Sequence, residues 1–178
     1  MKFDYFQVDS FTNKVFKGNP ACVVRLSKWL PDDILLNIAK ENAVAETAFF
    51  VEQGESFYLR WFTPDIEIDL CGHATLATAF VLKSVLGFSN DKIRFKTMSG
   101  NLTVTFENEI YFMDLPSRIP IKTTLPKEIK LALNIQPIEV LKARDYLLVF
   151  KDEQQIRDIL INRQQFDKIN LGFGGVIV

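Results

Sequence analysis

The sequence has 178 residues, of which 48% are hydrophobic and 24% charged, with a formal net charge of −1. This is the composition of an ordinary globular protein, long enough for one domain and part of a second. The near-neutral charge, without any Lys/Arg run, argues against nucleic acid or a membrane as a partner. No apolar run approaches the length of a membrane span, the N-terminus lacks a signal-peptide pattern, and Cys22 and Cys71 form no CxxC pair. We therefore expect a cytoplasmic protein with reduced thiols.

The first two thirds of the chain alternate predicted strands with two predicted helices. A turn at Gly18-Asn19-Pro20 precedes the second strand, and Pro31-Asp32-Asp33 has the residues of a helix start. Residues 71–86 predict a helix that is apolar almost all round, which belongs inside a structure, and Gly87 would end it. Aromatic and β-branched runs predict strands over residues 2–9, 21–26, 46–52, 56–62, 91–96, 101–106 and 109–114.

Three prolines, Pro116, Pro120 and Pro126, indicate a linker, so we expect one domain over residues 1–116 and another over residues 117–178. In the second, the pattern predicts a helix near residues 126–133, strands near 138–142 and 145–150, and a helix from Asp152 to about Leu160. Residues 174–178 begin an apolar strand that we expect to be unpaired. A C-terminal portion, supplied by another chain or lost by truncation, would account for that ending.

Glu46 is the first candidate for chemistry, because it stands among small and apolar neighbours in the segment NAVAETAF, residues 42–49. A carboxylate in such surroundings can serve as a general acid or base. The same spacing also fits a carboxylate at the start of a strand that faces water.

The second candidate is the start of the predicted buried helix, Cys71-Gly72-His73. Free backbone N–H groups at a helix N-terminus bind anions, and glycine lets a ligand approach closely. His73, the only histidine, could donate a hydrogen bond or relay a proton, or it could simply be a satisfied residue at a helix start. Asn19 and the segment Thr97-Met98-Ser99-Gly100 are weaker candidates. One histidine and two distant cysteines make a metal site unexpected.

Taken together, four segments resemble the PhzF family of phenazine-biosynthesis-like isomerases. They are FQVDSFTNKVFKGNPACVV, NAVAETAF, RWFTPDIEIDLCGHATLATAFVL and TMSGNLTV, which span nearly all of residues 1–115. The resemblance implies an α+β fold like that of diaminopimelate epimerases, in which a mixed, barrel-like sheet wraps around a central helix, here residues 71–86. Residues 117–178 would begin a second, incomplete domain of the same kind.

By this resemblance, Glu46 and His73 would be catalytic, and Gly72 and Asn19 would bind a small carboxylated substrate. The family works without metal or organic cofactor, and its members suggest a homodimer. Two features depart from the family pattern. Ala45 stands where a serine is common, and the DPVTGSA-like motif that carries the family's catalytic aspartate does not occur in these 178 residues. We therefore expect this chain to be inactive unless a complementary C-terminal segment completes it.

Two other functions fit the same residues. Cys71 at a helix N-terminus could be the thiol of an epimerase or racemase. The abrupt apolar ending would also fit a non-catalytic remnant or a binding module.

Overall fold

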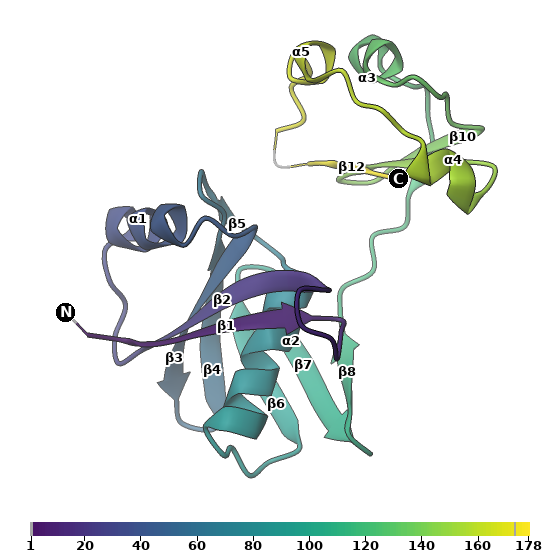
Figure 1. Ribbon diagram of the computed structural model, residues 1–178. Helices are drawn as coiled ribbons and strands as arrows, with labels where there is room; N and C mark the ends of the chain where they lie inside the picture. Colours follow the sequence, from purple (N-terminus) through teal and green to yellow (C-terminus); the bar gives the residue numbers. More distant parts are fainter. Residues whose placement is uncertain (1, 173) are drawn as a thin grey trace. The chain divides into compact units, whose positions relative to one another are not determined.

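The computed structural model describes residues 2–172 and 174–178 (Figure 1). Contacts among these residues divide the chain into two units, the first ending at Pro116 and the second beginning at Ser117. The candidate residues from the sequence all belong to the first unit.

A mixed eight-stranded sheet is the frame of the first unit, with strand order β1-β2-β3-β4-β6-β7-β8 and β5 as an additional partner of β4. Neighbours are antiparallel except for β2–β3 and β4–β6, which are parallel. Parallel neighbours need a crossover connection. Helix α1 (Asp32–Asn42) makes the first crossover, and α2 (Gly72–Phe80) with the π-helical turn η1 (Val81–Val85) makes the second. The strands are β1 (Asp4–Ser10), β2 (Asn19–Leu26), β3 (Glu46–Gln53), β4 (Ser56–Phe62), β5 (Glu67–Ile68), β6 (Lys92–Thr97), β7 (Gly100–Glu107) and β8 (Ile110–Asp114).

Both faces of the central strands are buried, because each face is covered by one of the two helices. Ala48 and Phe50 of β3 pack in the cluster around α2, whereas Phe49 between them packs in the cluster with Leu35 of α1. Successive side chains of a strand point to opposite faces, and strands covered on both sides are apolar throughout. The alternation also places Glu46 on the α2 face, two positions before Ala48.

Helix α2 lies against the inner face of the curved sheet and is built mostly from small residues (Figure 1). Ala74, Ala77 and Ala79 are buried, and the hydroxyls of Thr75 and Thr78 donate to the carbonyls of residues four positions earlier. The prediction of a buried helix over residues 71–86 is confirmed, except that its last turn is π-helical. Although α2 is apolar, no helix of the described ranges is long and apolar enough to cross a membrane.

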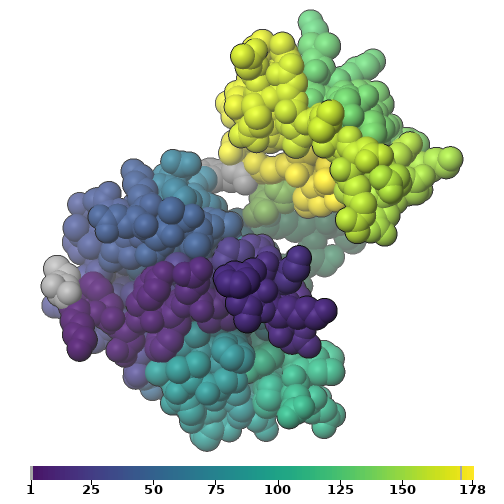
Figure 2. All heavy atoms as spheres, viewed as in Figure 1, coloured from purple at the N-terminus to yellow at the C-terminus, as the bar shows by residue number. Residues whose placement is uncertain are grey.

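The segment between β1 and β2 is anchored by Gly18. This residue has φ +81°, and a Cβ there would lie 2.3 Å from the backbone oxygen of Ser10, so no other residue fits. The remainder of the segment is exposed at the surface of the first unit (Figure 2, purple), with Phe11 68% and Phe16 95% accessible. These two phenylalanines add little to the core, but the close turn at Gly18 fixes the ends of β1 and β2 beside each other.

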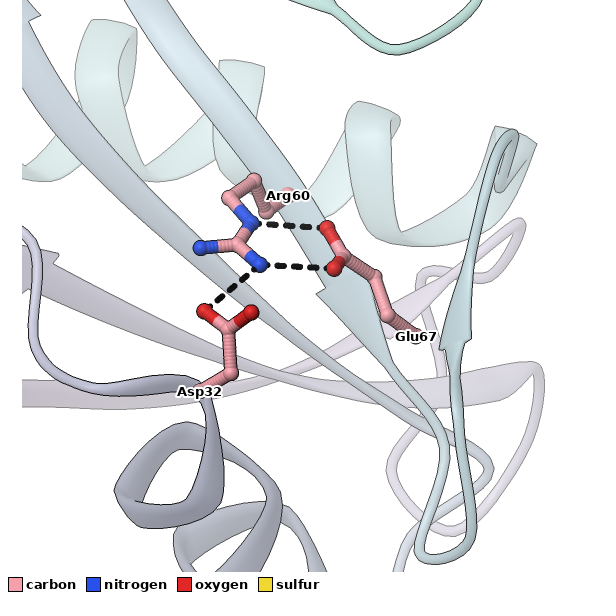
Figure 3. A network of polar contacts seen from close by, with 3 residues as sticks. All are labelled: Asp32, Arg60 and Glu67. Carbon is pink, nitrogen blue, oxygen red and sulfur yellow. Dashed lines mark hydrogen bonds and ion pairs between the residues drawn. The ribbon is translucent and has the colours of Figure 1, made fainter.

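Arg60 joins the strands that precede α2 to helix α1 (Figure 3). Its guanidinium donates two hydrogen bonds to the Glu67 carboxylate, at 2.7 and 2.6 Å, and one to Asp32 at 2.9 Å. The same group lies over the rings of Trp29 and Phe62. A bidentate, partly buried contact of this kind fixes geometry as well as adding stability. It holds β5, the strand from which the chain enters α2.

The second unit has a four-stranded sheet in the order β12-β11-β10-β9, with β11 and β12 parallel. Ile129 and Leu148 are the most buried members of its core cluster. The elements are β9 (Ile121–Lys122), α3 (Lys127–Ala132), β10 (Glu139–Lys142), β11 (Tyr146–Val149), α4 (Glu153–Arg157), α5 (Arg163–Phe166) and β12 (Val176–Ile177).

Two predictions for the second unit are wrong. The terminal strand is not unpaired, because Val176 and Ile177 pair with Tyr146 and Leu147 of β11. The helix predicted from Asp152 to about Leu160 ends at Arg157. Asn134 explains the early end, because its amide donates to the Asp158 carbonyl and accepts from the Leu160 N–H.

Candidate functional site

Glu46, Cys71 and His73 meet at the N-terminus of α2. One potential ligand atom from each of the three side chains lies within 4.8 Å of the others. The His73 ring is in the middle: its Nε2 is 3.1 Å from Glu46 Oε2, and its Nδ1 is 3.5 Å from Cys71 Sγ. The arrangement therefore links a thiol and a carboxylate through one imidazole.

Strand register brings these groups together. Glu46 pairs with Ala21 of β2, and both precede core residues that face α2. Ser10, the last residue of β1, lies on the same face, and its hydroxyl donates to the His73 carbonyl at 2.8 Å. The ends of three strands thus surround the first turn of the helix.

The Glu46–His73 contact is nearly closed to solvent. The side chain of His73 is 10% exposed and that of Glu46 18%. Although Glu46 Oε2 and His73 Nε2 are 3.1 Å apart, neither atom makes an aligned hydrogen bond with another described residue. Burial by itself would lower the pKa of His73, but contact with Cys71 and then with Glu46 outweighs burial and raises that pKa to about 10. A protonated His73 beside a carboxylate is the state that this geometry favours.

The backbone at the start of α2 offers a second feature. The first N–H groups of a helix lack partners within the helix, and Cys71, which precedes it, makes no capping hydrogen bond through its side chain. At Gly72, a Cβ would meet only Leu115, at 3.8 Å, which is an ordinary contact. Packing within this unit therefore does not demand glycine at position 72, and a helix start that carries no side chain is a suitable place for an anion.

The remaining candidates have different surroundings. Asn19 is exposed at the start of β2 and pairs with Ser10, so it lies at the same end of the sheet as Glu46. Ser99 supports the approach to the helix, since its hydroxyl donates to the Asp69 carbonyl at 2.8 Å. Ser10 was not among the candidates from the sequence. Alternation along β1 could have suggested it, once the face covered by α2 was known.

Comparison with known proteins places the chain in a family. The family model for phenazine biosynthesis-like proteins matches residues 8–160. The chain belongs to this family. It is 47% identical over 156 residues to an uncharacterized isomerase from Pseudomonas aeruginosa, covering 88% of this chain and 60% of that protein. It is 39% identical to an uncharacterized isomerase from Halalkalibacterium halodurans, covering 97% of this chain and 66% of that one. The chain thus spans about 60% of the length of the first of these relatives and two thirds of the second.

Solved structures confirm the predicted fold class. A crystal structure of a PhzF-family phenazine biosynthesis protein from Enterococcus faecalis matches with a TM-score of 0.86 and 44% identity, over 99% of this chain and 68% of that one. A structure described as a predicted epimerase from P. aeruginosa matches with a TM-score of 0.67 at 18% identity. At this identity the likeness concerns the fold alone. The α+β fold with a mixed sheet around a central helix is therefore confirmed.

Proposed function

We propose that this chain carries the proton-transfer half of a cofactor-independent isomerase that acts on a small carboxylated substrate. The observation that supports it is the buried contact between Glu46 Oε2 and His73 Nε2 at the N-terminus of α2, without other hydrogen-bond partners among the described residues. Burying polar atoms without aligned hydrogen-bond partners lowers the stability of the fold. Such an arrangement is therefore an indication of a functional site.

In the proposed mechanism Glu46 removes a proton from one carbon of the substrate and returns it at another. His73 stabilises the Glu46 carboxylate and assists the relay, because its raised pKa keeps it protonated at neutral pH. The substrate carboxylate lies against the N–H groups of Gly72 and His73, where the partial positive charge of the helix terminus favours an anion. Asn19, at the same end of the sheet, contributes a polar contact.

We further propose that turnover requires a second acidic group. The family resemblance assigns it to a DPVTGSA-like motif, which these 178 residues do not contain. A complementary C-terminal segment would provide that motif. Without it, the substrate would lack half of its contacts, and small errors in position alone reduce rates strongly.

The test is deuterium incorporation from D₂O into a panel of small carboxylic acids with an acidic C–H. The chain is co-expressed with the C-terminal portion of a family relative. Glu46→Gln should abolish exchange, while the matched variant Glu52→Gln should retain it, because Glu52 lies in the same strand but is 53% exposed and paired with Arg25. Exchange that persists in Glu46→Gln against every accepted acid contradicts the mechanism.

A thiol-based epimerase is the second candidate, favoured by the 3.5 Å separation of Cys71 Sγ from His73 Nδ1. In that mechanism Cys71 would carry the proton in place of Glu46. Cys71→Ser separates the two: full exchange activity in this variant removes the thiol mechanism, whereas loss of activity together with a fully active Glu46→Gln variant supports it.

A further inference from the structure

Glu46, Cys71 and His73 differ from a simple acid–base pair in offering three kinds of metal ligand. They present a carboxylate oxygen, a thiol sulfur and an imidazole nitrogen, one from each residue, all within 4.8 Å. Thiolate and imidazole are the ligands that zinc prefers, and carboxylate is a common third. One histidine and two distant cysteines made a metal site unexpected from the sequence, which does not show that β3 brings a carboxylate to the helix start.

The three potential ligand atoms lie within 4.8 Å of one another, a somewhat wider spacing than that of a coordination shell. Zinc binds sulfur at about 2.3 Å and nitrogen or oxygen at about 2.0–2.2 Å, so two ligands of a tetrahedral ion are roughly 3.3–3.7 Å apart. At present Glu46 Oε2 lies 3.1 Å from His73 Nε2, whereas Cys71 Sγ lies 3.5 Å from the other ring nitrogen, Nδ1. A rotation of the imidazole that points one nitrogen at the centre, with an adjustment of the carboxylate, would complete a three-ligand site.

Burial supplies an independent indication. The His73 side chain is nine-tenths buried, and its Nε2 has no aligned hydrogen-bond partner among the described residues; Glu46 Oε2 is in the same condition. A bound cation would satisfy both atoms at once. The ligands also stand on firm elements, since Glu46 begins a central strand and the His73 carbonyl is held by Ser10.

We propose that Glu46, Cys71 and His73 form a binding site for Zn²⁺ or a similar divalent ion, with three protein ligands and a fourth position open to solvent or substrate. The bound ion would inhibit isomerisation, because it occupies the carboxylate and the imidazole that transfer the proton. This second statement rests on the proposed function, whereas the binding site itself does not.

Binding is measured on the 178-residue chain without any assay of turnover. The protein, kept reduced with a phosphine that does not chelate metals, is titrated with ZnCl₂ in a calorimeter and with Cd²⁺ in an ultraviolet spectrometer. Cd²⁺ bound to a thiolate gives a charge-transfer band. We expect one ion per chain and a band that is kept in Cys22→Ser and lost in Cys71→Ser. Cys22 is the matched control because it is also buried, but against Tyr5.

His73→Asn and Glu46→Gln should each weaken Zn²⁺ binding by at least about tenfold. No binding, a band that follows Cys22, or unchanged affinity in both variants would overturn the proposal. If Cys71→Ser does not fold, as judged by circular dichroism, the other two variants decide the question because they keep both thiols. Zn²⁺ binding by the chain, together with no exchange by the complemented protein after metal removal with a chelator, would count against the proposed function alone. Exchange without Zn²⁺ binding would count against this site alone.

Discussion

The protonation of His73 can be measured directly, because the chain has a single histidine and hence one set of imidazole NMR signals. We predict that His73 in the metal-free protein titrates near pH 10 instead of near its ordinary 6.5. At roughly 1.4 kcal/mol per pH unit, this difference sets an upper limit of about 5 kcal/mol on the preference of the folded state for the protonated ring. Burial opposes that preference, and contact with Cys71 and Glu46 produces it.

The sign of the effect on stability follows from the raised pKa. The contribution of protonated His73 to the stability of the fold is fully present below pH 6.5, where the ring is protonated in both states. Between pH 6.5 and 10 the folded chain still holds this proton whereas the unfolded chain has released it, so the contribution is lost as pH rises through this range. Urea unfolding across this range should show the free energy of unfolding falling with pH. Glu46→Gln should lower the His73 pKa by about one unit or more and flatten the fall, and Glu52→Gln should do neither. A wild-type His73 that titrates at or below 6.5 would refute the reasoning.

Three further substitutions test the fold and the helix start. Arg60→Lys should lower the free energy of unfolding by roughly 1–2 kcal/mol, because lysine cannot reproduce the two hydrogen bonds to Glu67. The control Arg25→Lys, in an exposed ion pair, should change this free energy little. If urea titrations give the same loss for both variants, Arg60 has no special role. Ala77→Leu should lower the free energy of unfolding by roughly 1–3 kcal/mol, since Ala77 is fully buried between α2 and the sheet. An unchanged melting temperature would show that the core has room for the larger side chain. Gly72→Ala should leave the melting temperature unchanged or raise it, because the fold has room for the added methyl group. The same variant should bind substrate more weakly in the exchange assay. A lower melting temperature would show that the fold itself needs the glycine.

The strands and helices of the first unit were largely predictable from sequence, because the pattern is strong there. Apolar runs over β2 and β3 indicated strands, and the helix at residues 71–86 was predicted within one residue of its start. Three short elements, β5, β9 and α5, escaped prediction. β5 has two residues, and two residues are too few to show a period; it exists because Arg60 holds Glu67 beside β4.

The errors in the second unit have a common physical cause. Both the helix that ends early and the terminal strand that finds a partner depend on contacts between residues far apart in the chain. Asn134 acts on residues 158 and 160, and Tyr146 pairs with Val176. Local propensity contains no information about such partners, so tertiary contacts override it.

The meeting of Glu46 and His73, by contrast, follows from topology that the sequence did contain. Strands β3 and β4 form a hairpin around Gly54, so the end of β4 lies beside the start of β3, as the pairing of Thr47 with Phe62 shows. The chain leaving β4 must therefore enter its crossover helix at that same end. The residue that starts β3 and the first turn of α2 are then neighbours whatever their identities. What the sequence left open was which face the helix covers, since β3 is apolar on both. If α2 lay on the other face, Thr47 would meet the helix and Glu46 would not. The choice of face, made by packing of the small residues of α2 against Ala48, is what turns an ordinary strand-start carboxylate into a buried partner of His73.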